Sequence, residues 1–81
     1  MKVYVIRYEE RDCGGYSSGV CNVFSTLEKA REYLNTLKTS QIEYYNENDL
    51  RGYTLYEEND ELLFDFDENY DKYILEEREV R

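Results

Sequence analysis

Residues 20–38 read VCNVFSTLEKAREYLNTLK and hold the clearest local signals in the chain. Residues 20–24 form a short apolar run containing β-branched and aromatic side chains, which is typical of a strand. Ser25 and Glu28 follow with the spacing of a capping box, in which the Ser25 hydroxyl accepts from the Glu28 amide and the Glu28 carboxylate accepts from the Ser25 amide. We therefore expect a strand that passes directly into a helix beginning at Thr26.

The expected helix, residues 26–38, is amphipathic. Its apolar side chains recur at spacings of three and four residues, at Leu27, Ala30, Leu34 and Leu37, while polar residues fill the opposite side. A helix of this length rises about 20 Å, enough to cross three or four strands. One face of the helix should therefore pack on a sheet.

Further strands are expected on both sides of this helix. Residues 2–9 read as a strand and residues 10–19 as a polar, glycine-rich loop. Residues 53–57 and 61–66 read as two strands of a hairpin. Residues 72–80 form a last strand, whose charged end should be an exposed edge.

The register of the hairpin follows if Asn59 and Asp60 make a two-residue turn. One face then pairs Tyr53 with Phe66, Leu55 with Phe64 and Glu57 with Leu62, while the other pairs Tyr56 with Leu63 and Thr54 with Asp65. This register brings the aromatic side chains together, which a slip of one residue would not do.

The segment between the helix and the hairpin admits two interpretations. Ser40 and Glu43 repeat the capping-box spacing and Gly52 offers a C-terminal stop, which favours a short second helix. Alternatively, residues 42–45 form a strand or a loop.

These elements, in the order β-β-α-(α)-β-β-β, predict a single α+β domain over residues 1–81. We expect two layers, with an antiparallel or mixed sheet of four to five strands and the main helix packed on one face. The first strand is apolar on both sides at residues 3–6, whereas one helix covers only one face of a sheet. We therefore expect a homodimer whose second subunit covers the other face.

Composition excludes several kinds of chemistry. Because the chain has no histidine, neither a cysteine–histidine pair nor a serine–histidine–acid triad can form, and two cysteines alone make a poor zinc site. Cys21 reads as a buried small hydrophobe and Cys13 as an exposed loop thiol. No pair of carboxylates is singled out for acid–base work. We expect a non-enzymatic protein without a cofactor.

Two features indicate a cytoplasmic protein. The N-terminal residues enter a strand without the regions of a signal peptide, and no apolar run approaches the roughly 20 residues that span a bilayer. A reducing compartment argues against a disulfide between the two cysteines.

Negative charge is concentrated in one part of the chain. The formal charge is −9, and residues 41–71 contain eleven acidic residues against one base, Arg51, which is a net −10 and leaves +1 elsewhere. This charge disfavours direct binding of nucleic acid or anionic membrane and favours basic or neutral partners. Carboxylates spread along strands and loops could imitate a phosphate backbone, and a solvated surface that promotes solubility is the alternative.

Tyrosines lie in the same stretch, and tyrosine is enriched at recognition surfaces because its rigid ring carries a polar tip. The alternative is that several of them are half-buried core residues. The partner-binding residues predicted from charge and aromatic content are Glu57, Glu58, Asp60, Glu61, Asp65, Asp67, Tyr44, Tyr45, Tyr56 and Tyr70.

Residues 65–76 also match the ligand spacing of a calcium-binding loop, with Asp65, Asp67, Asn69, Asp71 and Glu76 at its first, third, fifth, seventh and twelfth positions. Tyr70 stands where that loop needs glycine for its sharp turn, and strands flank the segment instead of helices. We therefore expect no metal site.

Residues 1–5 (MKVYV), 23–30 (VFSTLEKA) and 73–76 (YILE) resemble small bacterial and phage proteins of uncharacterised function. Those proteins open with a similar strand, enter their helix through V-F-S-T-x-E-x-A and finish on a strand. The resemblance covers roughly half of the chain and implies the fold, while the acidic residues 41–71 depart from it.

Charge and surface chemistry lead to one functional hypothesis and one alternative. The hypothesis is an inhibitor encoded by a phage or mobile element, which docks an acidic, tyrosine-bearing face onto the basic groove of a nucleic-acid-handling host protein, such as a defence nuclease. The alternative is a small sensor or sequestering module whose oligomer holds a small ligand between subunits.

Overall fold

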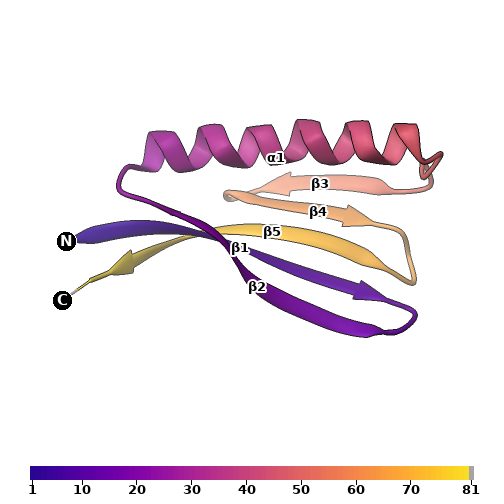
Figure 1. Cartoon of the computed structure of the whole chain (residues 1–81), viewed down its shortest axis with the longest axis horizontal. Coiled ribbons are helices and arrows are strands. Elements are labelled where there is room, and N and C mark those ends of the chain that lie inside the picture. The colour runs from indigo at the N-terminus through magenta and orange to yellow at the C-terminus, as the bar shows by residue number, and fades with distance from the viewer. Residues whose placement is uncertain (81) are drawn as a thin grey trace.

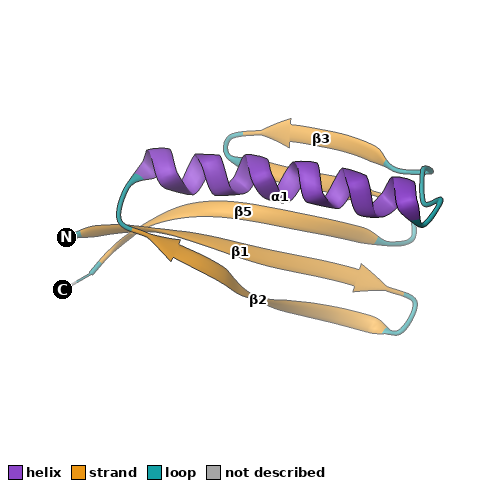
Figure 2. Ribbon diagram, turned by 45° about the horizontal axis from the view of Figure 1, so that its top comes forward, coloured by secondary structure: helices purple, strands orange, loops and turns teal. Residues whose placement is uncertain are grey.

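The computed structural model describes residues 1–80, in which one helix lies across one face of a five-stranded antiparallel sheet (Figure 1; Figure 2). The elements in chain order are β1 (Lys2–Asp12), β2 (Gly15–Phe24), α1 (Leu27–Glu47), β3 (Thr54–Glu58), β4 (Glu61–Asp65) and β5 (Tyr70–Glu79). The strands lie in the order β2-β1-β5-β4-β3. The α+β class and the two-layer arrangement agree with the prediction from the sequence.

The first and last strands form the centre of the sheet. β1 and β5 pair from Lys2 opposite Glu79 to Arg11 opposite Tyr70. The two ends of the chain therefore lie side by side (Figure 1), where the Val80 amide donates to the Met1 carbonyl at 2.7 Å. β5 begins two residues earlier than predicted, and no described strand other than β1 pairs with it beyond Ile74. Its charged end is thus open on one side, as expected.

The helix begins one residue later than predicted, because Thr26 is its N-cap in place of Ser25. Thr26 has extended backbone angles, and its hydroxyl accepts from the Lys29 amide at 3.3 Å. Ser25 and Thr26 each stand three residues before an amide that their hydroxyl can cap, the Glu28 and Lys29 amides respectively. The sequence favoured Ser25, whereas the structure uses Thr26.

The predicted end of the helix near residue 38 and the separate second helix are both wrong, because α1 runs without a break to Glu47. Thr36 and Thr39 do not end it, since their hydroxyls donate to the carbonyls of the preceding turn, from Glu32 and Asn35. The buried spacing also continues to Tyr45, so the longer helix of about 30 Å keeps one face on the sheet.

The predicted loop at residues 10–19 is also wrong, because most of it is strand. β1 extends to Asp12 and β2 begins at Gly15, which leaves a tight turn in which an Asp12 carboxylate oxygen accepts from the Gly14 amide at 2.8 Å. Gly15 has a φ of 144°, a conformation that side-chain-bearing residues rarely adopt. Polar composition was a misleading sign here, since both faces of this hairpin end lie near solvent.

The predicted register of the β3–β4 hairpin is confirmed. Leu55 pairs with Phe64, Tyr56 with Leu63, and Thr54 with Asp65, as the sequence indicated. Asn59 and Asp60 both have positive φ, which a two-residue turn between twisted strands requires.

The core lies between α1 and the helix-facing side of the sheet. Its buried members are Ile6, Ala30, Leu34, Tyr45, Leu62, Phe64 and Leu75. Tyr45 is 2% exposed, and its ring lies 5.0–5.2 Å from the rings of Tyr53, Phe64 and Phe66. These edge-on and tilted contacts attach the C-terminal half of the helix to β3 and β4.

We expect Phe64→Ala to be strongly destabilising, because Phe64 is fully buried within this cluster. The expected loss is about 3 to 5 kcal/mol of unfolding free energy, out of the roughly 4 to 12 kcal/mol of a domain this size. Urea unfolding followed by circular dichroism measures it. Leu50→Ala, at an exposed position, should change the value by less than about 0.5 kcal/mol. An unfolding midpoint unchanged in Phe64→Ala would contradict the proposed core.

Candidate functional site

The structure separates the predicted partner-binding residues instead of gathering them on one face. Glu57, Glu58, Asp60 and Glu61 lie at the β3–β4 turn, beside the N-terminal half of α1. The opposite end of the molecule, where α1 ends and β5 begins, holds Tyr44, Asp65, Asp67 and Tyr70. The predicted role of Tyr45 in partner binding has to be corrected, because the Tyr45 ring is buried in the core and offers no surface to a partner.

Three of the four acids at the β3–β4 turn are paired within the protein. Lys38 pairs with Glu57, Lys72 lies 3.8 Å from Glu61, and the Arg31 guanidinium donates to both oxygens of Asp60 at 3.1 and 3.2 Å. The hydrogen bond to Asp60 raises the pKa of Arg31. These three bases lie outside residues 41–71. The charge counted over that stretch alone therefore did not include them.

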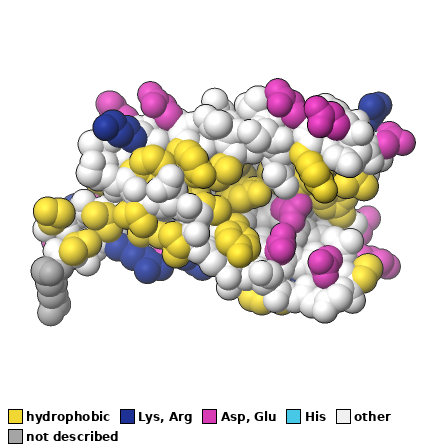
Figure 3. Space-filling view, in the orientation of Figure 1, with side chains coloured by type: hydrophobic (Ala, Val, Ile, Leu, Met, Phe, Trp, Pro, Cys, Tyr) yellow, Lys and Arg dark blue, Asp and Glu magenta, His cyan; other side chains and the backbone are white. Residues whose placement is uncertain are grey.

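At the opposite end Arg51 lies 3.7 Å from Asp49, but six other carboxylates have no such partner among the described residues. We call this group the acidic pole; its members are Glu10, Asp12, Glu47, Asp67, Glu68 and Asp71. Across residues 1–80, none of the six forms an ion pair with Lys, Arg or the N-terminus. They come from the β1–β2 turn, the end of α1 and the β4–β5 turn, which meet at one end of the fold (Figure 1). Acidic side chains lie along the upper edge of the space-filling view over both halves of α1, with basic side chains near each end of that edge (Figure 3).

An open groove of about 430 Å³ lies within the acidic pole. The strand ends supply Glu10, Arg11, Asp12, Phe66, Asn69, Tyr70 and Asp71, and the helix and its C-terminal turn supply Gln41, Tyr44, Tyr45 and Leu50. Tyr44 is half exposed, and Glu10 pairs directly opposite Asp71 across β1 and β5. Three carboxylates and the two accessible phenol rings of Tyr44 and Tyr70 thus share one groove.

The edge of the core forms the inner wall of this groove. The Tyr45 hydroxyl donates to the Asp71 carboxylate and accepts from Gln41 Nε2 at 3.2 Å. Burial, followed by the hydrogen bond to Asp71, raises the pKa of Tyr45 far above its usual range. Tyr45 therefore stays neutral and holds the Asp71 carboxylate in place.

This arrangement suits recognition of a cation. Carboxylates accept strong hydrogen bonds from guanidinium or ammonium groups, and the faces of Tyr44 and Tyr70 can pack against such groups. Cys13 lies beside Asn69, with its Sγ 3.9 Å from the Asn69 side-chain oxygen.

The calcium-loop pattern does not assemble into a ligand cluster. In the described part of the chain, no three His, Cys, Asp or Glu side chains are placed to hold a metal ion. Asp65 instead accepts from the Asp67 amide at 2.9 Å, and Asp71 accepts from Tyr45.

Sequence reasoning missed Glu10, Asp12, Glu47, Glu68 and Asp71 as site residues. Glu10 and Asp12 lie outside the acidic stretch, and only the pairing of β1 with β5 brings them to Asp71. Glu47, Glu68 and Asp71 had the right composition but no local feature that set them apart.

None of the family models, curated proteins or solved structures compared with this chain matches it. Within residues 1–80, the helix lacks the apolar length needed to cross a membrane.

Tyrosine ionisation should be coupled to unfolding at alkaline pH. Burial, followed by the charge of Asp71, raises the pKa of Tyr73 to about 12. Because the pKa of Tyr73 is raised in the folded state, the contribution of Tyr73 to the free energy of unfolding should be constant below its ordinary pKa near 10. This contribution should be lost as the pH rises towards 12. Tyrosinate absorbance and circular dichroism, recorded together, measure both events. Tyr73→Phe should weaken the alkaline loss, and an unchanged profile would contradict this assignment.

Proposed function

We propose that this protein is a non-enzymatic binding protein, which docks its acidic pole onto the basic groove of a nucleic-acid-binding protein. The observation that carries the proposal is the set of carboxylates that form no intramolecular ion pair around a tyrosine-walled groove, where Arg11 is the one basic lining residue in the described chain. An acid that already pairs with a lysine or arginine has less to offer a partner than one that faces only water.

The electrostatic contrast between the two ends selects the binding surface. At the β3–β4 turn, Arg31, Lys38 and Lys72 offset the acidic side chains. A basic partner would therefore be attracted to the acidic pole, where its arginines and lysines meet unpaired carboxylates.

The spacing of the carboxylates on β1 and β5 supports competition with nucleic-acid phosphates for the same basic groups. Glu10 and Asp12 are two residues apart on β1, which corresponds to about 7 Å along a strand, and the two side chains point to the same side. Asp71 adds a charge on the neighbouring strand. A row of carboxylates at such intervals can occupy lysines and arginines that otherwise contact a phosphate backbone.

We further propose a cytoplasmic location for this protein. Both cysteines are free thiols, which is compatible with the reducing cytoplasm. We propose an inhibitor encoded by a phage or mobile element, which acts in that compartment on a host protein such as a defence nuclease.

A second candidate is a module that binds a small cationic ligand in the groove. The groove volume of about 430 Å³ falls within the range of small-molecule sites. Native mass spectrometry of the purified protein distinguishes the two, because a ligand that co-purifies and leaves on acidification favours this alternative.

The partner is first isolated by affinity pull-down with the wild-type protein and should be a nucleic-acid-binding protein. We expect the triple variant Glu10→Gln, Asp67→Asn and Glu68→Gln to bind this partner at least tenfold more weakly. Asn is well tolerated at position 67, where φ is 71°. The measurement is isothermal titration calorimetry at two salt concentrations, and the salt dependence of the affinity should flatten in the variant. Unlabelled DNA or RNA should compete with the wild-type protein.

The matched control removes three charges elsewhere, through Glu28→Gln, Glu32→Gln and Glu77→Gln, all at exposed positions. It should keep most of the affinity if position matters as well as total charge. Equal losses in the two triple variants, or an affinity independent of salt, would contradict docking through the acidic pole.

A further inference from the structure

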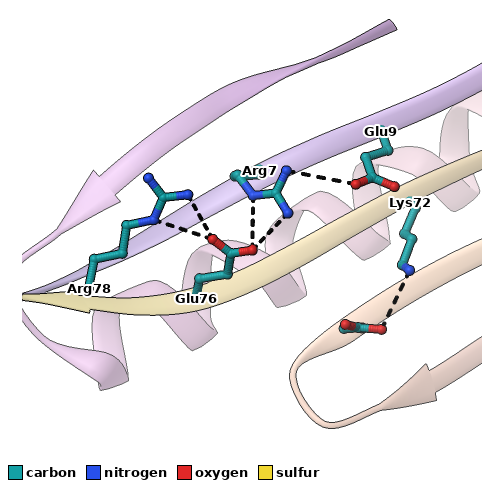
Figure 4. A network of polar contacts seen from close by, with 6 residues as sticks. Arg7, Glu9, Lys72, Glu76 and Arg78 are labelled. Carbon is teal, nitrogen blue, oxygen red and sulfur yellow. Dashed lines mark hydrogen bonds and ion pairs between the residues drawn. The ribbon is translucent and has the colours of Figure 1, made fainter. Parts of the chain in front are cut away.

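The face of the sheet opposite α1, here called the open face, is not covered by any described element. It consists of the odd-numbered positions of β1 from Val3 to Arg11, the even-numbered positions of β5 from Tyr70 to Arg78, and the residues that pair with them on the same side. Figure 4 shows this face with the helix behind the strands.

Exposed apolar side chains are concentrated there. Val20 and Val23 of β2 are 57% and 51% exposed, and they stand opposite Arg7 and Val5 of β1. Tyr56 of β3, on the same side, is 54% exposed. β2 and β3 are the two edge strands, so these side chains lie at both edges of the open face, while Val5 and Ile74 in its middle are only 6% and 9% exposed. Exposed apolar side chains at both edges of one sheet face favour an interface there.

A network of ion pairs crosses the middle of the open face (Figure 4). The Arg7 guanidinium donates to Glu76 Oε1 at 2.7 and 3.0 Å, and Arg78 donates to Glu76 Oε2 at 2.9 and 3.3 Å. Arg7 also lies 3.7 Å from Glu9. The hydrogen bonds from Arg7 and then Arg78 hold the pKa of Glu76 below its usual range.

The open face is nearly neutral, in contrast to the rest of the molecule. Its bases are Arg7, Arg11, Lys72 and Arg78. Its acids are Glu9, Glu58, Glu61, Asp65 and Glu76. Four bases and five acids give −1, so −8 of the total formal charge of −9 lies elsewhere.

We propose that the open face is the interface of a homodimer, in which a second copy of this chain packs on it about a two-fold axis. A two-fold axis places the same patch on both sides of the contact, so an occupant must be complementary to itself. Interspersed arginines and glutamates on a near-neutral apolar face satisfy this condition, whereas contact through the acidic pole would bring like charges together.

The available area is sufficient for a stable contact. Three strands of the open face have ten or eleven residues and two have five, so its flat area is roughly 650 Å² before side-chain relief is counted, close to the value of about 800 Å² per partner in a standard interface. The two acidic poles would stay at the ends of the dimer. This inference is therefore independent of the proposed function.

The test measures molar mass by size-exclusion chromatography with light scattering, over a range of concentrations up to about 100 μM, where typical specific contacts are saturated. The wild-type protein should elute at twice the chain mass of 9.9 kDa. The double variant Val20→Glu and Val23→Glu should raise the dimer dissociation constant at least tenfold, because it places four charges in the two-fold contact. Both side chains already reach solvent, so the monomer should stay folded.

Tyr56→Glu, on a different strand, gives an independent check and should weaken the dimer in the same direction. The charge-matched control, Asn35→Glu with Ser40→Glu on exposed positions of α1, should leave it intact. A monomeric wild-type protein at the highest concentration would overturn the proposal. So would a dimer unaffected by Tyr56→Glu and by the valine variants, since that result would assign the contact to a sheet edge.

Discussion

A single helix can cover only one face of a five-stranded sheet, and this constraint determines most of the molecule. The helix-facing side contains the core residues Ile6, Phe64 and Leu75, while the opposite side is left with Val20, Val23 and a network of ion pairs. Residues 1–80 contain no second helix to cover the other side. The exposed apolar side chains of that face and its near-neutral charge are the basis on which we propose a second copy of the chain as its partner.

The same fold decides which acidic residues are available for binding. Antiparallel pairing and the path of α1 bring Arg31, Lys38 and Lys72 to the acids of the β3–β4 turn, so that end is largely neutralised. At the other end, three chain reversals bring together six carboxylates that form no ion pair within the described chain, although Arg11 and Arg51 lie at the same end. Tyr45 joins this pole to the core, since its ring packs in the aromatic cluster and its hydroxyl holds Asp71. Integrity of the groove thus depends on core packing.

Sequence reasoning succeeded where the determining forces are local. The strand entering the helix, the β3–β4 register and the α+β class follow from side-chain periodicity and turn chemistry, which act within about ten residues. It failed at the helix end near residue 38 and at the supposed loop of residues 10–19. In both places weak local preferences were overridden by tertiary contacts, through Tyr45 in the core and through the pairing of β1 with β2 and β5.

The sequence by itself determined the amphipathic helix, the hairpin register, the strong acidity and the absence of histidine chemistry, because each depends on composition or short-range spacing. Only the tertiary structure decided that Tyr45 is core, that the acids of the β3–β4 turn are paired, and that Glu10 and Asp12 lie opposite and beside Asp71. The physical reason is that electrostatic interaction depends on distance in space, whereas the residues concerned are separated by many positions along the chain.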